Sequence, residues 1–393
     1  MNQPQTDIRK LVQAGLAALQ AGDAKRARVE FDRVIATGRA DASVHLAMAA
    51  ACRADHDPDG ALAAVDRALQ LDPRHMMALI FKADELANAG NMRSAAAHYQ
   101  QAVQQARAGA RLAPEIQREV DRAAAISERF ADDAEARVRG SLAKAGVTGG
   151  HGDSRFDASI DIMFGRRKIY TQQPRYYFFP ELPQRQFFDR SEFPWLDRVE
   201  AATDDICAEV LEVMRESAAF QPYVQDNPER PPREQVGLLN NPAWSAFYLW
   251  KDGELVAENA PRCPKTLAAL EGLPICRTTF RSPSIFFSLL RPGAHIPPHH
   301  GMVNTRLLCH LPLIVPAGCR LRVGNETREW VKGKAWLFDD TIEHEAWNDS
   351  AETRVILIFE VWRPELSEQE RVQVAGLFDA IDSDRGVRPK WEV

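Results

Sequence analysis

The chain has 393 residues, 45% of them hydrophobic and 26% charged, with a formal net charge of −6. This composition is typical of a soluble globular protein with two or three domains, and the negative charge argues against a general affinity for nucleic acid. The sequence begins without the apolar core of a signal peptide, and no run of about 18 apolar residues is present. We therefore expect no membrane span and a cytoplasmic location. The six cysteines form no CxxC pair, which indicates free thiols. A pair between Cys263 and Cys276, which flank one short segment, is the alternative.

The first third of the chain repeats itself at an offset of 34 residues. One position of each repeat holds a small residue: Ala27, Ala61 and Ala95. The position four residues later holds a larger apolar residue: Phe31, Val65 and Tyr99. Another small-residue position lies earlier in the repeat, and in the first repeat it holds Gly15. This period, with small residues where two helices touch, is the signature of tetratricopeptide (TPR) repeats. We predict an α-helical TPR solenoid of three repeats, closed by a polar helix, in a domain over residues 1–140.

Such a solenoid presents a concave surface, and we expect it to hold a peptide or protein substrate. The alternatives are a structural spacer and a module through which the chain forms a homo-oligomer. A Gly-rich polar stretch follows and predicts a linker over residues 141–157. Beyond it we expect a helix over 194–216, a strand within 240–254 and a short helix over 263–274.

From about Arg277 the hydrophobic pattern changes from a period of 3.6 to a period of 2. The segments expected to be strands are 278–290, 306–316, 319–325, 327–333, 335–340 and 354–362. Short strands separated by regular turns fit a cupin-like double-stranded β-helix, a form of jelly roll. We place it in a domain over residues 158–393 with a terminal helix over 364–381, so the whole chain is expected to be an α + β multidomain protein.

Five of the ten histidines fall in this β-rich part, and an arginine, Arg354, follows the last of them. Non-haem iron(II) oxygenases hold their metal with two histidines and one carboxylate. His299 and His344 are 45 residues apart, but Gly301 stands where a carboxylate is expected. A structural zinc site with four ligands is a further interpretation. Other residues that would complete a metal site are His295, His300, Asp339 and Asp340.

Several motifs, in order, resemble the aspartyl/asparaginyl β-hydroxylase family of 2-oxoglutarate oxygenases. They are FFPELP, WSAFYLW, SLLRPGAHIPPHHG, NTRLLCHLPLIVP and TRVILIFEVWRPEL, and the resemblance runs over about half of the chain. A TPR array ahead of the catalytic domain is similar to the animal members. The resemblance implies that iron(II) is held by His299 and His344 alone, with Gly301 at the acid position, and that 2-oxoglutarate and O₂ are the co-reactants.

The same resemblance implies three residues that bind 2-oxoglutarate. Arg354 would hold the distal carboxylate with its planar guanidinium, since this group can donate two parallel hydrogen bonds. Ser288 would donate to the same carboxylate, and His310 would lie close to the bound molecule. The alternatives are a surface charge for Arg354 and a hydrogen-bonded core histidine for His310.

The activity implied is hydroxylation of an unactivated C–H bond, most simply the β-carbon of an Asp or Asn residue in a peptide. Arg306 is the candidate for substrate binding, whereas Leu308 stands where animal members carry a second arginine. This difference leaves a small molecule or a lipid acyl chain as alternative substrates. A further alternative is a non-catalytic interaction protein with an inactive β-domain.

Overall fold

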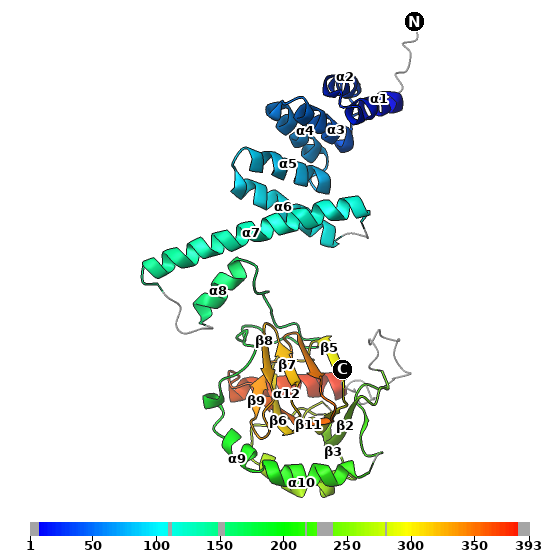
Figure 1. The fold of residues 1–393 in the computed structure, drawn as a ribbon. Helices are drawn as coiled ribbons and strands as arrows, with labels where there is room; N and C mark the ends of the chain where they lie inside the picture. The colour runs from blue at the N-terminus through cyan, green and yellow to red at the C-terminus, as the bar shows by residue number, and fades with distance from the viewer. Residues whose placement is uncertain are drawn as a thin grey trace. The chain divides into compact units, whose positions relative to one another are not determined.

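The computed structural model describes residues 8–108, 112–147, 154–216, 218–225, 239–279 and 281–383. The chain divides into two compact units, Met1–Phe164 and Gly165–Val393 (Figure 1). In the described residues of the first unit, every regular element is a helix, and the second unit combines β-sheets with helices. Within the described ranges, no helix has both the length and the apolar character needed to cross a bilayer.

Six helices in the first unit form the three predicted pairs, and each packs on the next. Their bounds are α1 (Ile8–Gln20), α2 (Ala24–Ile35), α3 (Ala42–Ala54), α4 (Pro58–Leu71), α5 (Met76–Asn88) and α6 (Met92–Ala108). Three of the helices begin after an aspartate whose side chain accepts a backbone N–H of the first turn: Asp23, Asp41 and Asp57. These caps satisfy donors that the helix itself leaves free.

The small and large residues of the predicted repeat positions are buried between the helices. Ala27 and Phe31 are fully buried, as are their equivalents in the second repeat. A Cβ atom added at Gly15 would lie 2.7 Å from the Phe31 ring. This close approach explains why the first repeat has glycine at this position.

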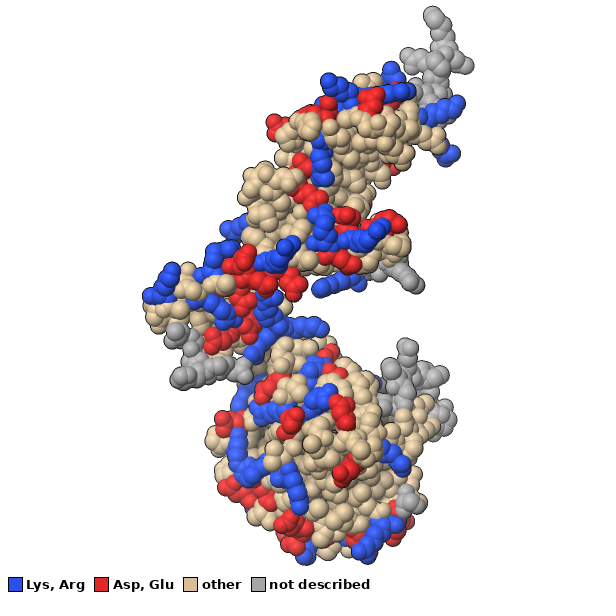
Figure 2. All heavy atoms as spheres, viewed as in Figure 1, with Lys and Arg blue, Asp and Glu red and all other residues tan. Residues whose placement is uncertain are grey.

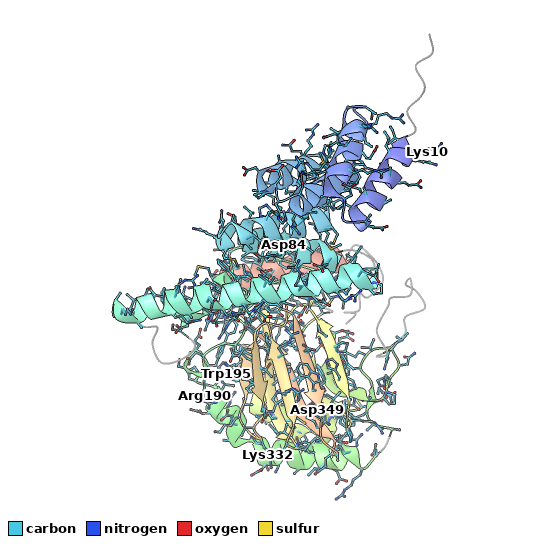
Figure 3. The ribbon with its side chains drawn as sticks, turned by 45° about the horizontal axis from the view of Figure 1, so that its top comes forward. Lys10, Asp84, Arg190, Trp195, Lys332 and Asp349 are labelled. Atoms are coloured by element: carbon cyan, nitrogen blue, oxygen red, sulfur yellow. The ribbon has the colours of Figure 1, made fainter. Side chains whose placement is uncertain are left out.

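A long helix, α7 (Pro114–Lys144), follows the repeats and continues into the segment predicted to be a linker. It is tied to the last pair through Asp84 on α5 (Figure 3). Asp84 accepts hydrogen bonds from the Tyr99 hydroxyl at 2.5 Å and from Arg122 of α7 at 3.0 Å. A further short helix, α8 (Arg155–Met163), completes this unit.

The second unit contains two antiparallel sheets. Seven strands form one sheet in the order β1-β2-β4-β11-β6-β9, with β3 paired to β2, and four strands form the other in the order β5-β10-β7-β8. Bounds in the large sheet are β1 (Gln221–Pro222), β2 (Trp244–Lys251), β3 (Glu254–Leu255), β4 (Ile285–Leu290), β6 (Arg306–Ile314), β9 (Trp336–Phe338) and β11 (Arg354–Trp362). Bounds in the small sheet are β5 (His295–His299), β7 (Cys319–Val323), β8 (Glu326–Glu329) and β10 (His344–Asn348). The six strands predicted from Arg277 onward are present: β11 has the predicted bounds, β8 begins one residue early and ends sooner, and the other four are shorter than predicted. The strands β5 and β10 were not predicted.

One face of the large sheet is covered by helices. These are η1 (Arg190–Glu192), α9 (Leu196–Ala201), α10 (Thr203–Met214), η2 (Ala260–Arg262) and α11 (Pro264–Leu270). The single helix predicted over 194–216 is therefore two short ones. Leu357 and Phe359 of β11 pack against this layer, and the ring of Trp195 lies 6.0 Å from that of Phe359 (Figure 3).

The opposite face of the large sheet packs on the small sheet. Ile356 and Ile358 of β11 contribute to this second core, together with Leu321 of β7. Successive side chains of a strand point to opposite faces. Even-numbered residues such as Phe286 of β4, Leu308 of β6 and Ile356 of β11 therefore face the space between the two sheets.

The last helix, α12 (Glu368–Ser383), begins four residues after the predicted start. It packs through Val374 and Phe378 against Leu182 and Trp362. All six cysteines are buried and free, which confirms the prediction of unpaired thiols.

Basic and acidic side chains are interspersed over the described part of the β-rich unit that is visible in Figure 2. Many of them pair on the outer face of the small sheet. Arg322, for example, lies 2.7 Å from Glu343 and also pairs with Glu345. This surface therefore carries mixed charge rather than a patch of one sign.

Candidate active site

His299 and His344 lie opposite each other on neighbouring strands. The two residues are register partners between β5 and β10, and their ring centroids are 4.0 Å apart. The register shifts by one residue between this pair and the next one, Ile296 with Ala346. Such a β-bulge re-aims a side chain. It allows both imidazoles and the core residue Ile296 to share the inner face of the sheet.

Each imidazole is oriented by a hydrogen bond to the backbone. The Nδ1 atom of His299 donates to the Pro297 carbonyl at 2.8 Å, and that of His344 donates to the Ile342 carbonyl at 3.1 Å. These bonds place the proton on Nδ1 and leave Nε2 as the atom able to bind a metal. Burial lowers the pKa of His299 to about 4 and that of His344 well below its usual value. Both rings are therefore neutral at pH 7, as metal ligands must be.

Gly301 stands against an acidic residue from another part of the chain. Its N–H donates to the Asp340 carbonyl at 2.6 Å, and a Cβ atom at this position would lie 2.0 Å from Asp340 Oδ2. No side chain fits at position 301 unless Asp340 moves. Burial raises the pKa of Asp340 to about 7, although Arg306 opposes that change. Residue 301 therefore cannot provide a carboxylate side chain as the usual third ligand.

Two of the other candidate ligands, His295 and Asp339, are engaged elsewhere. His295 contacts Glu345 at 3.0 Å through Nε2 and stacks on Trp347 with ring centroids 5.0 Å apart. The Asp339 carboxylate is fully buried and accepts hydrogen bonds from three other residues. Among the described residues, no group of three or more His, Cys, Asp or Glu side chains is arranged to hold a metal. A closed zinc site with four protein ligands has no candidate in those ranges.

Arg354 is a buried cation without a carboxylate partner in the described part of the chain. Its Nη1 lies 3.4 Å from both the carbonyl oxygen and the hydroxyl of Ser288, and its Nε has no hydrogen-bond partner. Its guanidinium carbon lies 5.0 Å from the centre of the Trp330 ring. Burial lowers its pKa to about 10, so the group stays charged at pH 7. Burying an unpaired charge is costly, and this environment fits the binding of an anion.

Ser288 and His310 lie beside this arginine on the inner face of the large sheet. The Ser288 hydroxyl accepts a hydrogen bond from Trp244 Nε1 at 3.3 Å. His310 is buried with its Nδ1 unpaired, and burial holds its pKa well below its usual value. Its ring packs on the edge of Phe338 with centroids 4.7 Å apart. Polar atoms left without partners in this way are typical of a site that a ligand completes.

Side-chain contacts join the histidine pair to the arginine. Phe338 lies between His344 and His310, at 5.5 and 4.7 Å from their ring centroids. On the other side, Trp244 lies 6.2 Å from His299. The contacts close into a ring that we call the site ring: His299, His344, Phe338, His310, Trp330, Arg354, Ser288 and Trp244. All of the residues predicted to bind iron or 2-oxoglutarate are therefore members of one connected group.

Arg306 has a different environment from the one expected of a substrate-binding cation. It is buried, with Asp340 at 3.2 Å and Glu360 at 3.4 Å. Burial opposes its charge, but these two acids hold its pKa above the usual value. Its charge is balanced inside the protein, and a role in binding substrate remains a prediction. Leu308 is half-buried on the same face and packs against the inner core.

Three members of the site ring were not recognised from the sequence. Trp244, Trp330 and Phe338 read as ordinary core aromatics, because nothing in their local sequence distinguishes them from other apolar residues. Only the pairing of strands far apart in the chain brings them to the site. A signal was present for Trp244, which lies in one of the motifs that resemble the hydroxylase family.

Comparison with known proteins shows which family the β-rich part of the chain resembles. Residues 200–364 match the model of a family described as aspartyl/asparaginyl beta-hydroxylase. This segment of the chain is therefore similar to the aspartyl/asparaginyl β-hydroxylase family, as its motifs predicted.

Several proteins of known name are similar in sequence to the chain. The chain is 42% identical over 139 residues to the aspartyl/asparaginyl beta-hydroxylase of Homo sapiens, covering 35% of this chain and 18% of that one. It is 34% identical over 180 residues to the ornithine lipid ester-linked acyl 2-hydroxylase of Rhizobium tropici, covering 45% and 60%. It is 32% identical over 214 residues to aspartate beta-hydroxylase domain-containing protein 2 of Homo sapiens, covering 53% and 55%. The chain thus spans less than two thirds of each of these relatives.

Solved structures match the helical unit. PcrH from Pseudomonas aeruginosa is 20% identical over 33% of this chain and 94% of its own, with a TM-score of 0.30. The Sgt2 TPR domain from Aspergillus fumigatus is 18% identical over 33% and 83%, with a TM-score of 0.28. A likeness at this level carries no argument about binding.

Proposed function

We propose that the chain is an iron(II)- and 2-oxoglutarate-dependent dioxygenase that hydroxylates an unactivated C–H bond. The proposal includes the fold: the two sheets would be the halves of a double-stranded β-helix. The observation that carries it is the site ring, in which two neutral histidines and a buried, unpaired arginine belong to one connected group. The match of residues 200–364 to the model of a hydroxylase family supports it independently.

His299 and His344 would hold the iron through their Nε2 atoms. Their Nδ1 hydrogen bonds fix the orientation of both rings before any metal arrives, which lowers the cost of binding. Iron(II) with 2-oxoglutarate and O₂ would supply the oxidising chemistry that replaces a C–H bond by C–OH. With Gly301 in place of an acid, the protein fills only two coordination positions and leaves the others to co-reactants and water.

Arg354 and Ser288 would bind the distal carboxylate of 2-oxoglutarate. The guanidinium is already desolvated, so a carboxylate that reaches it forms a charge-assisted pair without first displacing bulk water. Trp330 limits the orientation of the guanidinium from one side. His310, neutral and with an unpaired nitrogen, would contribute a further hydrogen bond to the same molecule.

For the substrate we propose an Asp or Asn residue of a peptide or protein, held in part by the helical repeats. The name of the human relative supports this choice. A lipid acyl chain is the second candidate, supported by the name of the Rhizobium relative and by the apolar Leu308 on the inner face. In both cases the relatives extend beyond the matched segment, so the substrate is part of the proposal.

The test is turnover of 2-oxoglutarate in air with iron(II), measured as succinate, with peptide and acyl-lipid pools analysed for products heavier by one oxygen atom. We expect succinate from the wild-type chain and none above background from His299→Ala or His344→Ala. His295→Ala, at a histidine outside the site ring, is the matched control and should retain activity. Wild-type succinate formation in either ligand variant would contradict the proposal.

A further inference from the structure

A segment that lies before the matched family region braces both of the loops that carry the candidate metal ligands. We call residues 170–188 the strap. Its backbone donates to the loop before His344, from Gln173 to the Thr341 carbonyl at 2.8 Å. It also donates to the loop after His299, from Arg175 to the Gly301 carbonyl at 2.9 Å. The strap therefore bonds to both loops.

One side chain of the strap connects the two loops directly. Gln172 accepts a hydrogen bond from Asn304 Nδ2 at 2.9 Å and donates through Nε2 to Asp339 Oδ2 at 2.6 Å. Asn304 is five residues after His299, and Asp339 is five residues before His344. The carboxamide of Gln172 uses both its acceptor and its donor in this relay. No carboxylate or alkyl group of the same size could replace it in both roles.

The far ends of the relay are held firmly. Asp339 also accepts from Arg363 Nη1 at 2.6 Å, and from the N–H and hydroxyl of Thr341 at 3.0 and 2.5 Å. Asn304 accepts a bond from Phe179 N at 2.7 Å. The side chains of Asn304, Asp339 and Arg363 are fully buried, and Gln172 is 6% exposed. Buried networks with every member satisfied are rigid.

We infer that Gln172 is a positioning residue that sets the separation of His299 and His344. The inference rests on the proposed function, in which those two histidines hold the metal. It implies that a working metal site requires the strap, although the family model begins only at residue 200. Groups that orient metal ligands through hydrogen bonds contribute strongly to metal affinity.

The experiment replaces Gln172 by methionine, which has similar length but no amide. The matched control is Gln186→Met, in the same strap, because the Gln186 amide oxygen accepts from Asn325 N at 3.2 Å in the turn between β7 and β8. Each full-length protein is titrated with Co(II) in the absence of air and of 2-oxoglutarate, below its melting temperature. Thermal unfolding of the metal-free proteins is measured in parallel.

We expect Co(II) to bind Gln172→Met at least about ten-fold more weakly than wild type, and Gln186→Met within about two-fold of wild type. A purely structural role would lower the melting temperature of Gln172→Met without changing the metal affinity of the folded protein. That outcome would overturn the inference and leave the proposed function standing. A wild-type chain that binds no Co(II) would overturn the proposed function itself, and the inference with it.

If Gln172→Met does not fold, Thr341→Val provides the second variant, since it removes one donor to Asp339 with little change of volume. We expect a weakening of Co(II) binding by about three-fold, the smaller effect because three donors to Asp339 remain. Wild-type affinity in a folded Thr341→Val protein would overturn the inference.

Discussion

Arg354 has surroundings that folding alone does not explain. A fully buried guanidinium normally pairs with a carboxylate, as Arg363 does with Asp339 at 2.6 Å. Among the residues that the structure describes, the partners of the Arg354 guanidinium are a serine and the face of a tryptophan. The chain thus retains a charge that weakens the folded state, and the simplest reason is a ligand with the opposite charge.

We predict that Arg354→Met changes the stability of the protein and its affinity for 2-oxoglutarate in different ways. Removing a buried unpaired charge should leave the free energy of unfolding unchanged or raise it by about 1 kcal/mol. The affinity for 2-oxoglutarate should fall at least about 100-fold, since a desolvated charge pair is lost. Urea unfolding and anaerobic calorimetry with Co(II) in place of iron measure the two effects. Unchanged affinity for 2-oxoglutarate would remove Arg354 from the site.

Asp340 predicts a pH effect on stability. Burial raises its pKa from 3.8 to about 7, so ionisation is less favourable in the folded state than in the unfolded chain. Wild-type stability should therefore lose a contribution from this group as pH rises from about 4 to about 7, by at most about 1.4 kcal/mol per pH unit. Asn at this position cannot ionise.

The free energy of unfolding of Asp340→Asn, relative to wild type, should accordingly rise with pH across that window and level off above about pH 8. Urea unfolding of both proteins at four pH values between 5 and 8 measures the difference. If the difference between the two free energies of unfolding does not change with pH, ionisation of Asp340 does not destabilise the folded protein.

At the scale of single residues, the sequence indicated which side chains meet but not what surrounds them. His299, His344 and Arg354 were chosen from their order and from the family motifs. Why Gly301 must be glycine was not readable, because the atom that excludes a side chain belongs to Asp340, 39 residues later. The ion pairs of Arg306 were equally hidden, since Glu360 reaches it only through the pairing of β6 with β11.

Among the elements, the helical repeats were the best predicted. Their signal is local: a small residue marks the place where two helices of one repeat touch. The strand β5 was missed for an equally physical reason. β5 contains Pro297 and Pro298, which normally argue against a strand and are tolerated here because β5 lies at the edge of its sheet.

The repeat packing makes a prediction for Gly15 on α1. Alanine is the better helix former by about 1 kcal/mol, but its Cβ would lie 2.7 Å from the buried Phe31 ring. We expect Gly15→Ala to lower the free energy of unfolding of the helical unit by about 1–2 kcal/mol.

Gly140 on α7 is the matched control, because a Cβ there would have nothing within 4 Å. Gly140→Ala should raise stability by up to about 1 kcal/mol. Urea unfolding followed by far-ultraviolet circular dichroism compares the two variants. Equal effects of the two substitutions would mean that α1 and α2 are not packed as closely as described.

At the scale of the whole molecule, a helical unit of repeats and a β-rich unit with the site ring share one chain. Order along the chain and the change in hydrophobic period sufficed to predict this division. The part played by the strap was not predictable, because it depends on hydrogen bonds between Gln172 and residues more than 130 positions away. The central claim is that the β-rich unit binds iron and 2-oxoglutarate together.

Anaerobic titration of the full-length chain with iron(II) and 2-oxoglutarate tests that claim most directly. Chelation of iron by 2-oxoglutarate gives a weak metal-to-ligand absorption band in visible light. We predict this band for the wild-type chain, its loss in His299→Ala and His344→Ala, and its appearance only at much higher 2-oxoglutarate in Arg354→Met. A wild-type chain that gives no band at saturating iron and 2-oxoglutarate would contradict the account.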